Sequence, residues 1–345
     1  MNLPAPACLL TVDLAAIVAN WRMIAAKTKA AAVVKADAYG LGAAPVARAL
    51  AQAGCTRFFV ATLAEAVELR DAVIDAEILV LSGVEEADIG TFTRLRLIPV
   101  LNSQAQARIW AGRPAALNFD TGMSRLGFDG DEPVDCRPML VMSHLACPDT
   151  PEHPLNRRQL ERFAMIRSRF PGIEASLAAS SGIFLGADYL FDWVRPGAAL
   201  YGVNPTPGRP NPMAPAVRLE AKILQLRYVD EDTTVGYGAT HLTSGRTRLA
   251  TVAAGYADGL FRTLGNRGHA HFGDYRLPLV GRVSMDLTMF DVTAVEDAAL
   301  VEGAMIELIG THASVDDLAS EAGTIGYEIL TSLGPRIQRH YLGNA

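Results

Sequence analysis

Short, predominantly apolar runs recur along the first half of the chain, separated by segments long enough to form helices. Strands that are apolar on both faces are buried on both faces, as in parallel sheets that helices cover. Such a series of strand and helix units predicts an α/β fold, a (β/α)8 TIM-type barrel. No glycine-rich fingerprint follows the first run, which disfavours a doubly wound sheet. The seven runs are AAVV (31–34), FFVA (58–61), ILVL (78–81), IPVL (98–101), ALNF (116–119), LVMS (140–143) and ASLAA (175–179).

The eighth strand of this barrel has two candidate positions. We place it at residues 189–194, ending at Arg195, and the alternative is residues 199–202. A proline-rich segment, NPTPGRPNPMAP (204–215), then predicts an extended linker without helix. Beyond it, apolar and polar residues alternate from Val217, which is typical of strands with one buried face. The expected domains are a barrel over residues 1–212 and a predominantly β C-terminal domain over residues 213–345.

Composition and charge exclude several classes of protein. With 31 basic and 37 acidic residues, the net charge is −6 and the basic residues are scattered, which disfavours a nucleic-acid partner. No run approaches the length of a membrane-spanning helix. The first 21 residues carry no Lys or Arg, unlike a secretory signal, so we expect a cytoplasmic protein.

Cysteine and histidine spacing does not favour a metal site. The four cysteines stand far apart without a CxxC pair, as expected of apolar residues in a reducing compartment. His269 and His271 alternate along an expected strand, but no third ligand is evident, so we expect them on a solvated strand face and not in a metal site. We expect no metal.

Polar residues follow several of the apolar runs, where a barrel places its active site. Lys35 ends the first run, and its buried ammonium requires either an ion pair or a lowered pKa suited to imine formation. Residue position alone leaves these two uses equally favoured. The other candidates are Arg125, His144, Ser181 and Arg195. Arg195 and Asp120 have a structural alternative, an ion pair at the mouth of the barrel.

The loops after the last two strands resemble a phosphate site. Ser181 offers a hydroxyl, and Gly197 with Ala198 offers backbone N–H groups. A lysine at one strand end and a phosphate site at another suggest a phosphorylated aldehyde cofactor bound through an imine, with pyridoxal 5'-phosphate the obvious candidate.

Eight motifs, in order along nearly the whole chain, resemble those of the alanine racemases, which are fold-type III pyridoxal-phosphate enzymes. The resemblance implies a barrel followed by a β domain, and a homodimer with shared active sites. The motifs are DLAAIVANW (13–21), VVKADAYGLG (33–42), DTGMSRLGF (120–128), RPGAALYG (195–202), VGYGATH (235–241), GYADG (255–259), GRVSMD (281–286) and GYE (326–328).

The resemblance also implies a role for each matching residue. Lys35 would hold the cofactor and act as one base, and Tyr237 from the partner subunit would be the opposite base. Arg125 and the backbone of Met285 would hold the substrate carboxylate, and Tyr256 would line the passage to the site. Arg195 would face the pyridine nitrogen and His144 the ring, while the phosphate would lie among Tyr39, Ser181, Gly197, Ala198 and Tyr327.

Chemistry supports these roles. Racemisation removes a proton from one face of a carbon and returns one to the other face, so it needs two opposed bases. Lysine and tyrosine ordinarily titrate near pH 10, so each pKa must be lowered. An arginine cannot readily give its proton to the pyridine nitrogen, which limits delocalisation into the cofactor and so limits side reactions.

The sequence departs from the family pattern at three positions. Asn118 replaces a lysine that is carbamylated in some members, and we expect its neutral amide to orient Arg125, with or without an anion such as chloride. Asp37 and Ser180 replace asparagines.

The expected reaction is interconversion of L- and D-alanine, for cell-wall peptidoglycan or for catabolism. The alternatives are a racemase of broader range that includes serine, a decarboxylase, and a non-catalytic pyridoxal-phosphate carrier. Apart from its own partner subunit, we expect only the amino-acid substrate to bind, and neither nucleic acid nor membrane.

Overall fold

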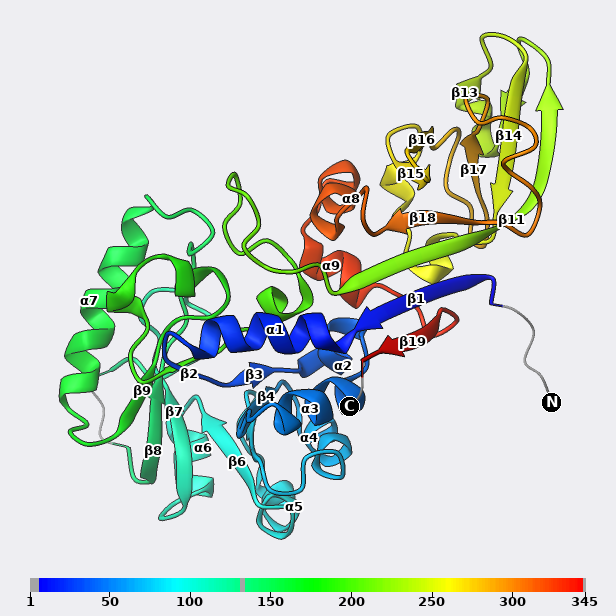
Figure 1. Ribbon diagram of the computed structural model, residues 1–345. Helices are drawn as coiled ribbons and strands as arrows, with labels where there is room; N and C mark the ends of the chain where they lie inside the picture. Colours follow the sequence, from blue (N-terminus) through cyan, green and yellow to red (C-terminus); the bar gives the residue numbers. More distant parts are fainter. Residues whose placement is uncertain (1–5, 131–133, 344–345) are drawn as a thin grey trace. The chain divides into compact units, whose positions relative to one another are not determined.

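The chain forms two compact units in the computed structural model, which describes residues 6–130 and 134–343 (Figure 1). The barrel unit spans Leu14–Ala214. The C-terminal unit combines the described residues up to Asp13 with Pro215–Gly343. No helix within the described residues is long and apolar enough to cross a membrane.

Parallel strands form the centre of the barrel unit, as the apolar runs predicted. Seven of them pair in sequence order, and each pair is parallel. Phe58, Phe59 and Leu117 on these strands are almost fully buried. The strands are β3 (Ala32–Val33), β4 (Arg57–Val60), β5 (Glu77–Val80), β6 (Leu97–Leu101), β7 (Pro114–Asn118), β8 (Arg137–Met142) and β9 (Glu174–Ser176).

Two short strands close the ring. β10 (Trp193–Val194) pairs with β2 (Lys29–Ala30), which precedes β3 along the same edge. On its other side, the Arg195 N–H donates to the Ala178 carbonyl at 3.0 Å. The expected (β/α)8 architecture is therefore confirmed. The eighth strand is shorter than predicted, because residues 187–189 form a 3₁₀ turn, and the alternative at 199–202 is wrong because it is largely 3₁₀ helix.

Helices follow the strands and cover the outside of the barrel. Some of them begin with capping side chains: Thr62 and Glu65 form a capping box on α4, and Ser103 caps α6. The α-helices are α1 (Leu14–Ala25), α2 (Lys35–Gly40), α3 (Ala43–Gln52), α4 (Leu63–Arg70), α5 (Ile89–Arg94), α6 (Gln104–Ile109) and α7 (Pro154–Ser168). The 3₁₀ helices are η1 (Glu86–Asp88), η2 (Ser181–Phe184), η3 (Ala187–Tyr189) and η4 (Ala198–Tyr201).

The C-terminal unit is mostly β, as the alternating pattern predicted. Its long strand β11 (Val217–Val229) pairs with β1, β14 and β18, and Val235, Leu249 and Val280 form a small core. The other strands are β12 (Thr234–Val235), β13 (His241–Leu242), β14 (Thr247–Val252), β15 (His269–Phe272), β16 (Tyr275–Pro278), β17 (Thr288–Asp291), β18 (Met305–Ile309) and β19 (Gln338–Leu342). Its helices are η5 (Tyr237–Ala239), η6 (Tyr256–Asp258), η7 (Arg262–Leu264), α8 (Val315–Ala322) and α9 (Gly326–Thr331).

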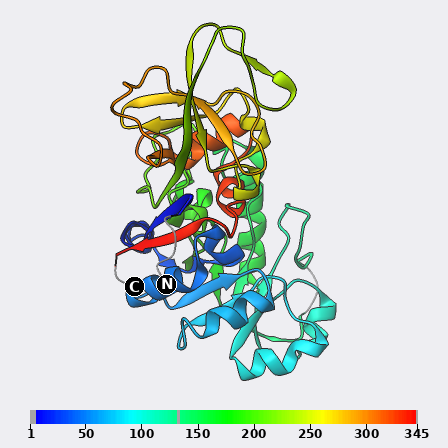
Figure 2. The ribbon, with the colours of Figure 1, turned by 90° about the vertical axis from the view of Figure 1, so that its right-hand side faces the viewer.

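The start of the chain belongs to the C-terminal unit, which differs from the expected division at 212/213. Strand β1 (Cys8–Asp13) pairs antiparallel with β11 and parallel with β19 (Figures 1 and 2). Both of these partner strands are more than 200 residues away along the chain. The units therefore divide after Asp13 and after Ala214.

Candidate active site

The predicted residues of the barrel unit lie at the carboxyl ends of its strands. Lys35 lies two residues after β3, Arg125 lies in the loop after β7, and His144 lies two residues after β8. Ser181 begins η2 after β9, and Arg195 directly follows β10. Because the strands are parallel, these ends meet at the same rim of the barrel.

A left-handed turn follows Lys35. Ala36, Asp37, Ala38 and Tyr39 have φ between 51° and 59°, a conformation that L-residues rarely adopt in succession. Strain of this kind persists only where surrounding contacts enforce it, and such places are concentrated at functional sites.

Glu65 holds this turn in place. One of its carboxylate oxygens accepts the Ala36 N–H at 2.8 Å, and the other accepts the Ala61 N–H at 2.6 Å. One side chain thereby links the residue after Lys35 to the end of β4. Burial lowers the pKa of the Lys35 amine, and the nearby charge of Arg125 lowers it further, although Glu65 acts in the opposite direction. The lowered pKa favours a neutral, nucleophilic amine.

Arg195 is buried and fully engaged by the barrel. Its guanidinium donates to Ser176 Oγ at 2.6 Å and to the Ser143 carbonyl at 2.6 Å. Burial lowers its pKa to about 9, so it remains charged at neutral pH. Asp120, the alternative partner, instead accepts backbone N–H groups from residues 122–124.

His144 is a neutral imidazole beside that cation. Burial lowers its pKa to about 3, and the charges of Arg195, Arg125 and Lys35 contribute. Its Nδ1 lies 3.4 Å from Arg195 Nη2. Because a guanidinium only donates, Nδ1 is the acceptor and Nε2 carries the ring proton. His144 can therefore pack against an aromatic ring without adding charge.

A small cradle lies at the start of η4. A Cβ on Gly197 would come within 2.4 Å of the Tyr39 hydroxyl oxygen, so only glycine permits this approach. The Ser180 hydroxyl accepts N–H groups from Gly197 and Ala199, each at 3.1 Å. The Gly197 N–H, which the sequence analysis assigned to phosphate, therefore donates to Ser180 instead. The Ala198 N–H lies in the first turn of the helix, where N–H groups have no partner within the helix. A hydroxyl, a helix start and a nearby amine suit the phosphate and aldehyde of pyridoxal phosphate.

The loop that carries Arg125 is held at both ends. The Asp120 N–H donates to the Phe128 carbonyl, and the Phe128 N–H donates to the Asn118 carbonyl, both at 2.9 Å. The Asn118 amide donates to Asn102 Oδ1 at 2.9 Å and to the Leu126 carbonyl at 3.1 Å. Arg125 itself is exposed. The orienting role expected of Asn118 stays a prediction. Its amide bonds the loop backbone at Leu126, the residue after Arg125.

In the C-terminal unit, the segment 281–286 contacts the loops of two predicted site residues, Tyr237 and Tyr256. A Cβ on Gly238, next to Tyr237, would lie 2.7 Å from Arg282 Nη1. At the other end, the Tyr256 N–H donates to the Ser284 carbonyl at 3.0 Å. Tyr237, Tyr256 and Met285 are 72 %, 45 % and 54 % exposed. Tyr327 is half-buried on α9.

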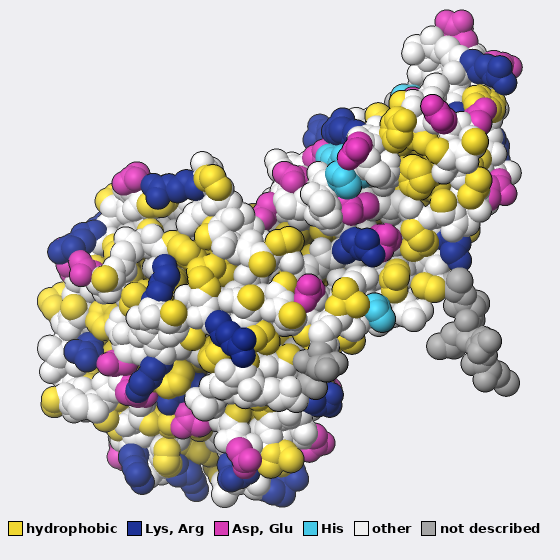
Figure 3. All heavy atoms as spheres, in the orientation of Figure 1, with side chains coloured by type: hydrophobic (Ala, Val, Ile, Leu, Met, Phe, Trp, Pro, Cys, Tyr) yellow, Lys and Arg dark blue, Asp and Glu magenta, His cyan; other side chains and the backbone are white. Residues whose placement is uncertain are grey.

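Three histidines, His269, His271 and His312, cluster in the C-terminal unit beside acidic side chains. Figure 3 shows histidine atoms next to acidic ones on the surface of this unit. The His271 ring lies 4.9 Å from that of His269 and 5.4 Å from that of His312. His271 is buried and not on a solvated strand face, so that expectation is wrong for it, because His312 stacks on its ring. Among the residues that the structure describes, no three His, Cys, Asp or Glu side chains are arranged to hold a metal ion.

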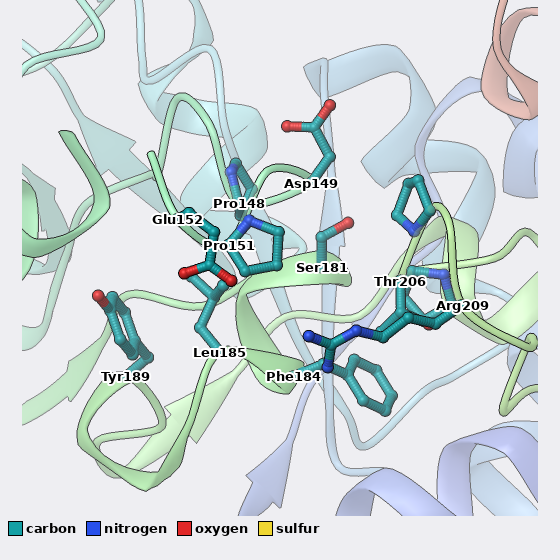
Figure 4. Close-up of a pocket in the computed structure, with 12 residues that line it drawn as sticks. Pro148, Asp149, Pro151, Glu152, Ser181, Phe184, Leu185, Tyr189, Thr206 and Arg209 are labelled. Atoms are coloured by element: carbon teal, nitrogen blue, oxygen red, sulfur yellow. The ribbon is translucent and has the colours of Figure 1, made fainter. Parts of the chain in front are cut away.

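A cavity of about 270 Å³ lies elsewhere in the barrel unit, among the loops after β8, β9 and η4 (Figure 4). Asp149, Ser181 and Arg209 border it together with several prolines. Ser181 also belongs to the predicted phosphate site, whereas Lys35 does not line this cavity.

The sequence reasoning missed the residues that hold the site rather than form it. Glu65, Asn102 and the pair Asp258 and Arg336 were not predicted. For Glu65 a signal was available, since T-x-x-E (62–65) is the pattern of a capping box. Asn102 and Arg336 contact residues far away along the chain and leave no local pattern.

Two family models match the chain: alanine racemase, N-terminal domain, over residues 12–205, and alanine racemase, C-terminal domain, over residues 216–341. The chain belongs to the alanine racemase family. Its relatives include a catabolic alanine racemase from Mesorhizobium japonicum, 48% identical over 98% of this chain and 94% of that protein. A biosynthetic alanine racemase from Agrobacterium fabrum is 45% identical over 96% of this chain and 93% of that protein.

Solved structures in this family have the same fold. Alanine racemase from Bartonella henselae, which has covalently bound pyridoxal phosphate, matches with a TM-score of 0.93 and 40% identity, over 98% of this chain and all of that one. The biosynthetic enzyme from Pseudomonas aeruginosa matches with a TM-score of 0.91 and 35% identity, over 98% of this chain and all of that one. The family and the fold predicted from the motifs are thereby confirmed.

Proposed function

We propose that this protein interconverts L- and D-alanine with pyridoxal phosphate held on Lys35, and that Lys35 and Tyr237 are the two opposed bases. The observation that carries the proposal is the barrel rim, where the Lys35 amine, with its lowered pKa, directly precedes a strained turn that brings the Tyr39 hydroxyl against Gly197. The names of the relatives, racemases of alanine, support the reaction.

Bound pyridoxal phosphate supplies an electron sink that makes the α-proton of an amino acid acidic. We assign its covalent attachment to Lys35. We assign the phosphate to the Tyr39 and Ser181 hydroxyls, the Ala198 N–H and Tyr327, with Gly197 leaving room for the approach of Tyr39 because it has no side chain. The contact of the Gly197 amide with Ser180 leaves the Ala198 N–H as the main backbone donor.

Arg195 and His144 set the charge around the cofactor ring. Arg195 keeps its proton at neutral pH and is fixed by Ser143 and Ser176, so it is suited to face a pyridine nitrogen that stays unprotonated. Neutral His144 adds no charge of its own. Both features limit charge delocalisation and favour prompt return of the proton.

Lys35 and Tyr237 move the proton. The lowered pKa of Lys35 raises the share of its amine that is neutral and able to accept a proton. Tyr237 lies between Gly236 and Gly238, both of positive φ, so its ring is presented at a tight turn. Arg125 and the Met285 backbone hold the substrate carboxylate in this proposal, and Tyr256 lines the passage.

The active enzyme in this proposal is a homodimer. Tyr237, Tyr256 and Met285 are large, apolar and exposed on the C-terminal unit, which supports a surface that a second copy covers. If the Tyr237 of each subunit serves the partner's Lys35, two equivalent sites arise by two-fold symmetry. We place the enzyme in the reducing cytoplasm, in keeping with four unpaired cysteines.

Incubation with L-alanine in heavy water tests the reaction. We expect α-proton exchange together with formation of D-alanine, and slower turnover of serine. Exchange without inversion would remove Tyr237 from its role as second base. Bound cofactor without any exchange would favour the carrier. In Tyr237→Phe we expect retention of cofactor and loss of turnover in at least one direction.

Mixing two inactive variants tests the shared site. Lys35→Ala and Tyr237→Phe chains should regain activity when mixed, because one hybrid site in each heterodimer is intact. Absence of recovery, once subunit exchange is demonstrated, would refute sharing.

A further inference from the structure

One guanidinium binds two carboxylates in the C-terminal unit. Arg336 Nε and Nη2 donate to the two oxygens of Asp258, each at 3.0 Å, and Nη1 donates to Asp286 Oδ1 at 2.7 Å. The Asp258 side chain is 9 % exposed, whereas that of Asp286 is 57 % exposed. A planar guanidinium can hold two carboxylates at once in a fixed geometry, which an ammonium cannot do.

Each carboxylate belongs to a loop that carries a residue of the proposed site. Asp258 ends η6, two residues after Tyr256, and Asp286 directly follows Met285. The Asp258 carboxylate also accepts the Gly255 N–H at 2.9 Å, which closes the η6 loop on itself. A displacement of Arg336 would therefore displace both loops.

The two loops also contact each other directly. The Tyr256 N–H donates to the Ser284 carbonyl and the Ala257 N–H to the Met285 carbonyl, both at 3.0 Å. A Cβ on Gly255 would lie 2.3 Å from the Met285 carbonyl oxygen, so glycine is required for this approach. The Met285 carbonyl therefore packs closely on Gly255, and the residue after it, Asp286, is bound by Arg336.

We propose that Arg336 is a positioning residue for racemisation, because it fixes the Met285 peptide and Tyr256 relative to each other. This inference rests on the proposed function, in which the Met285 backbone binds the substrate carboxylate and Tyr256 lines the passage. Arg336 touches neither substrate nor cofactor. It acts on the relative position of the two loops. Its loss should therefore raise KM for alanine more than it lowers cofactor occupancy.

The test compares Arg336→Ala and Arg336→Lys with Arg218→Ala, all as holoenzymes. Arg218 is a matched control in the same unit, since it is similarly exposed and bonds Glu220 at 3.1 Å. A misplacement of about 1 Å costs roughly a hundredfold in rate. We therefore expect Arg336→Ala to lower kcat/KM by about tenfold to a hundredfold, mainly through KM. We expect Arg336→Lys to recover part of the loss and Arg218→Ala to behave as wild type.

Stability is measured alongside, so that unfolding is not mistaken for misplacement. An Arg336→Ala enzyme with wild-type kcat and KM and full cofactor occupancy, even with a lower Tm, would overturn the proposal. If that variant does not fold, Asp286→Asn replaces it, because it leaves the buried Asp258 pair intact. An unchanged KM in Asp286→Asn would then refute the role.

A double-mutant cycle separates this inference from the proposed function. Asp286→Asn and Arg336→Ala should be non-additive in kcat/KM, since the first weakens and the second removes the same contact. Full additivity would overturn the proposal that Arg336 acts through its contact with Asp286. The two-base assignment fails separately, if Tyr237→Phe turns over alanine in both directions as wild type does.

Discussion

Adding one methyl group to Gly197 should weaken cofactor binding. In Gly197→Ala the new Cβ would lie 2.4 Å from the Tyr39 hydroxyl oxygen, against an ordinary contact distance of 3.4 Å or more. The hydroxyl must therefore move by about 1 Å (3.4 − 2.4), and the ring behind it cannot retreat freely because it packs on Tyr201 at a centroid distance of 4.9 Å. A shift of that size would break the hydrogen bond to phosphate that the proposed function assigns to this hydroxyl.

The magnitude follows from the kind of bond that is lost. A hydrogen bond to a charged group contributes about 1.5–3 kcal/mol, which corresponds to roughly a tenfold to hundredfold rise in Kd. The assay is titration of the apoenzyme with pyridoxal phosphate, followed by absorbance. Gly90→Ala is the matched control, since a Cβ there meets nothing within 4 Å.

Two outcomes would refute this reasoning. The first is a Kd for Gly197→Ala within twofold of wild type. The second is additivity with Tyr39→Phe: once the hydroxyl is gone, the added methyl should cost less, because its closest contact no longer exists.

Three further predictions concern other parts of the chain. Arg70 donates to five backbone carbonyls, including those of Val73, Ala76 and Leu95, so Arg70→Met should lower the free energy of unfolding by about 3–5 kcal/mol in urea titration; full rescue by Arg70→Lys would contradict this account. Burial lowers the pKa of His271, with His269 and His312 contributing, so its stabilisation should be present above the unfolded pKa of 6.5 and decline as pH falls below it. Thermal unfolding of His271→Gln should show a weaker loss between about pH 7 and pH 5, and an equal loss would refute the assignment. Asn118→Ala should raise KM for alanine about tenfold, the effect of roughly one hydrogen bond, with unchanged cofactor affinity, and steady-state kinetics would expose an unaltered KM.

Local sequence patterns were sufficient for the architecture. Runs such as FFVA and ILVL are apolar on both faces, and a strand of that kind has few folded environments other than the interior of a parallel sheet. The switch to alternating polarity at Val217 predicted the β-rich unit for a similar reason. Lys35 could be identified because a charged residue at the end of a buried strand requires an explanation.

Only the tertiary structure decided which unit the first strand joins and what holds the site together. Residues 8–13 look like any short strand, and β11 and β19 become their partners only when the chain has returned from the barrel. Glu65, Asn102 and Arg336 act through contacts with residues far away in sequence or through backbone groups, and such contacts leave no periodicity to read. Hydrophobic burial leaves a local pattern in the sequence, whereas the hydrogen bonds around Lys35, Arg125 and Met285 depend on which segments folding brings within about 3 Å of each other.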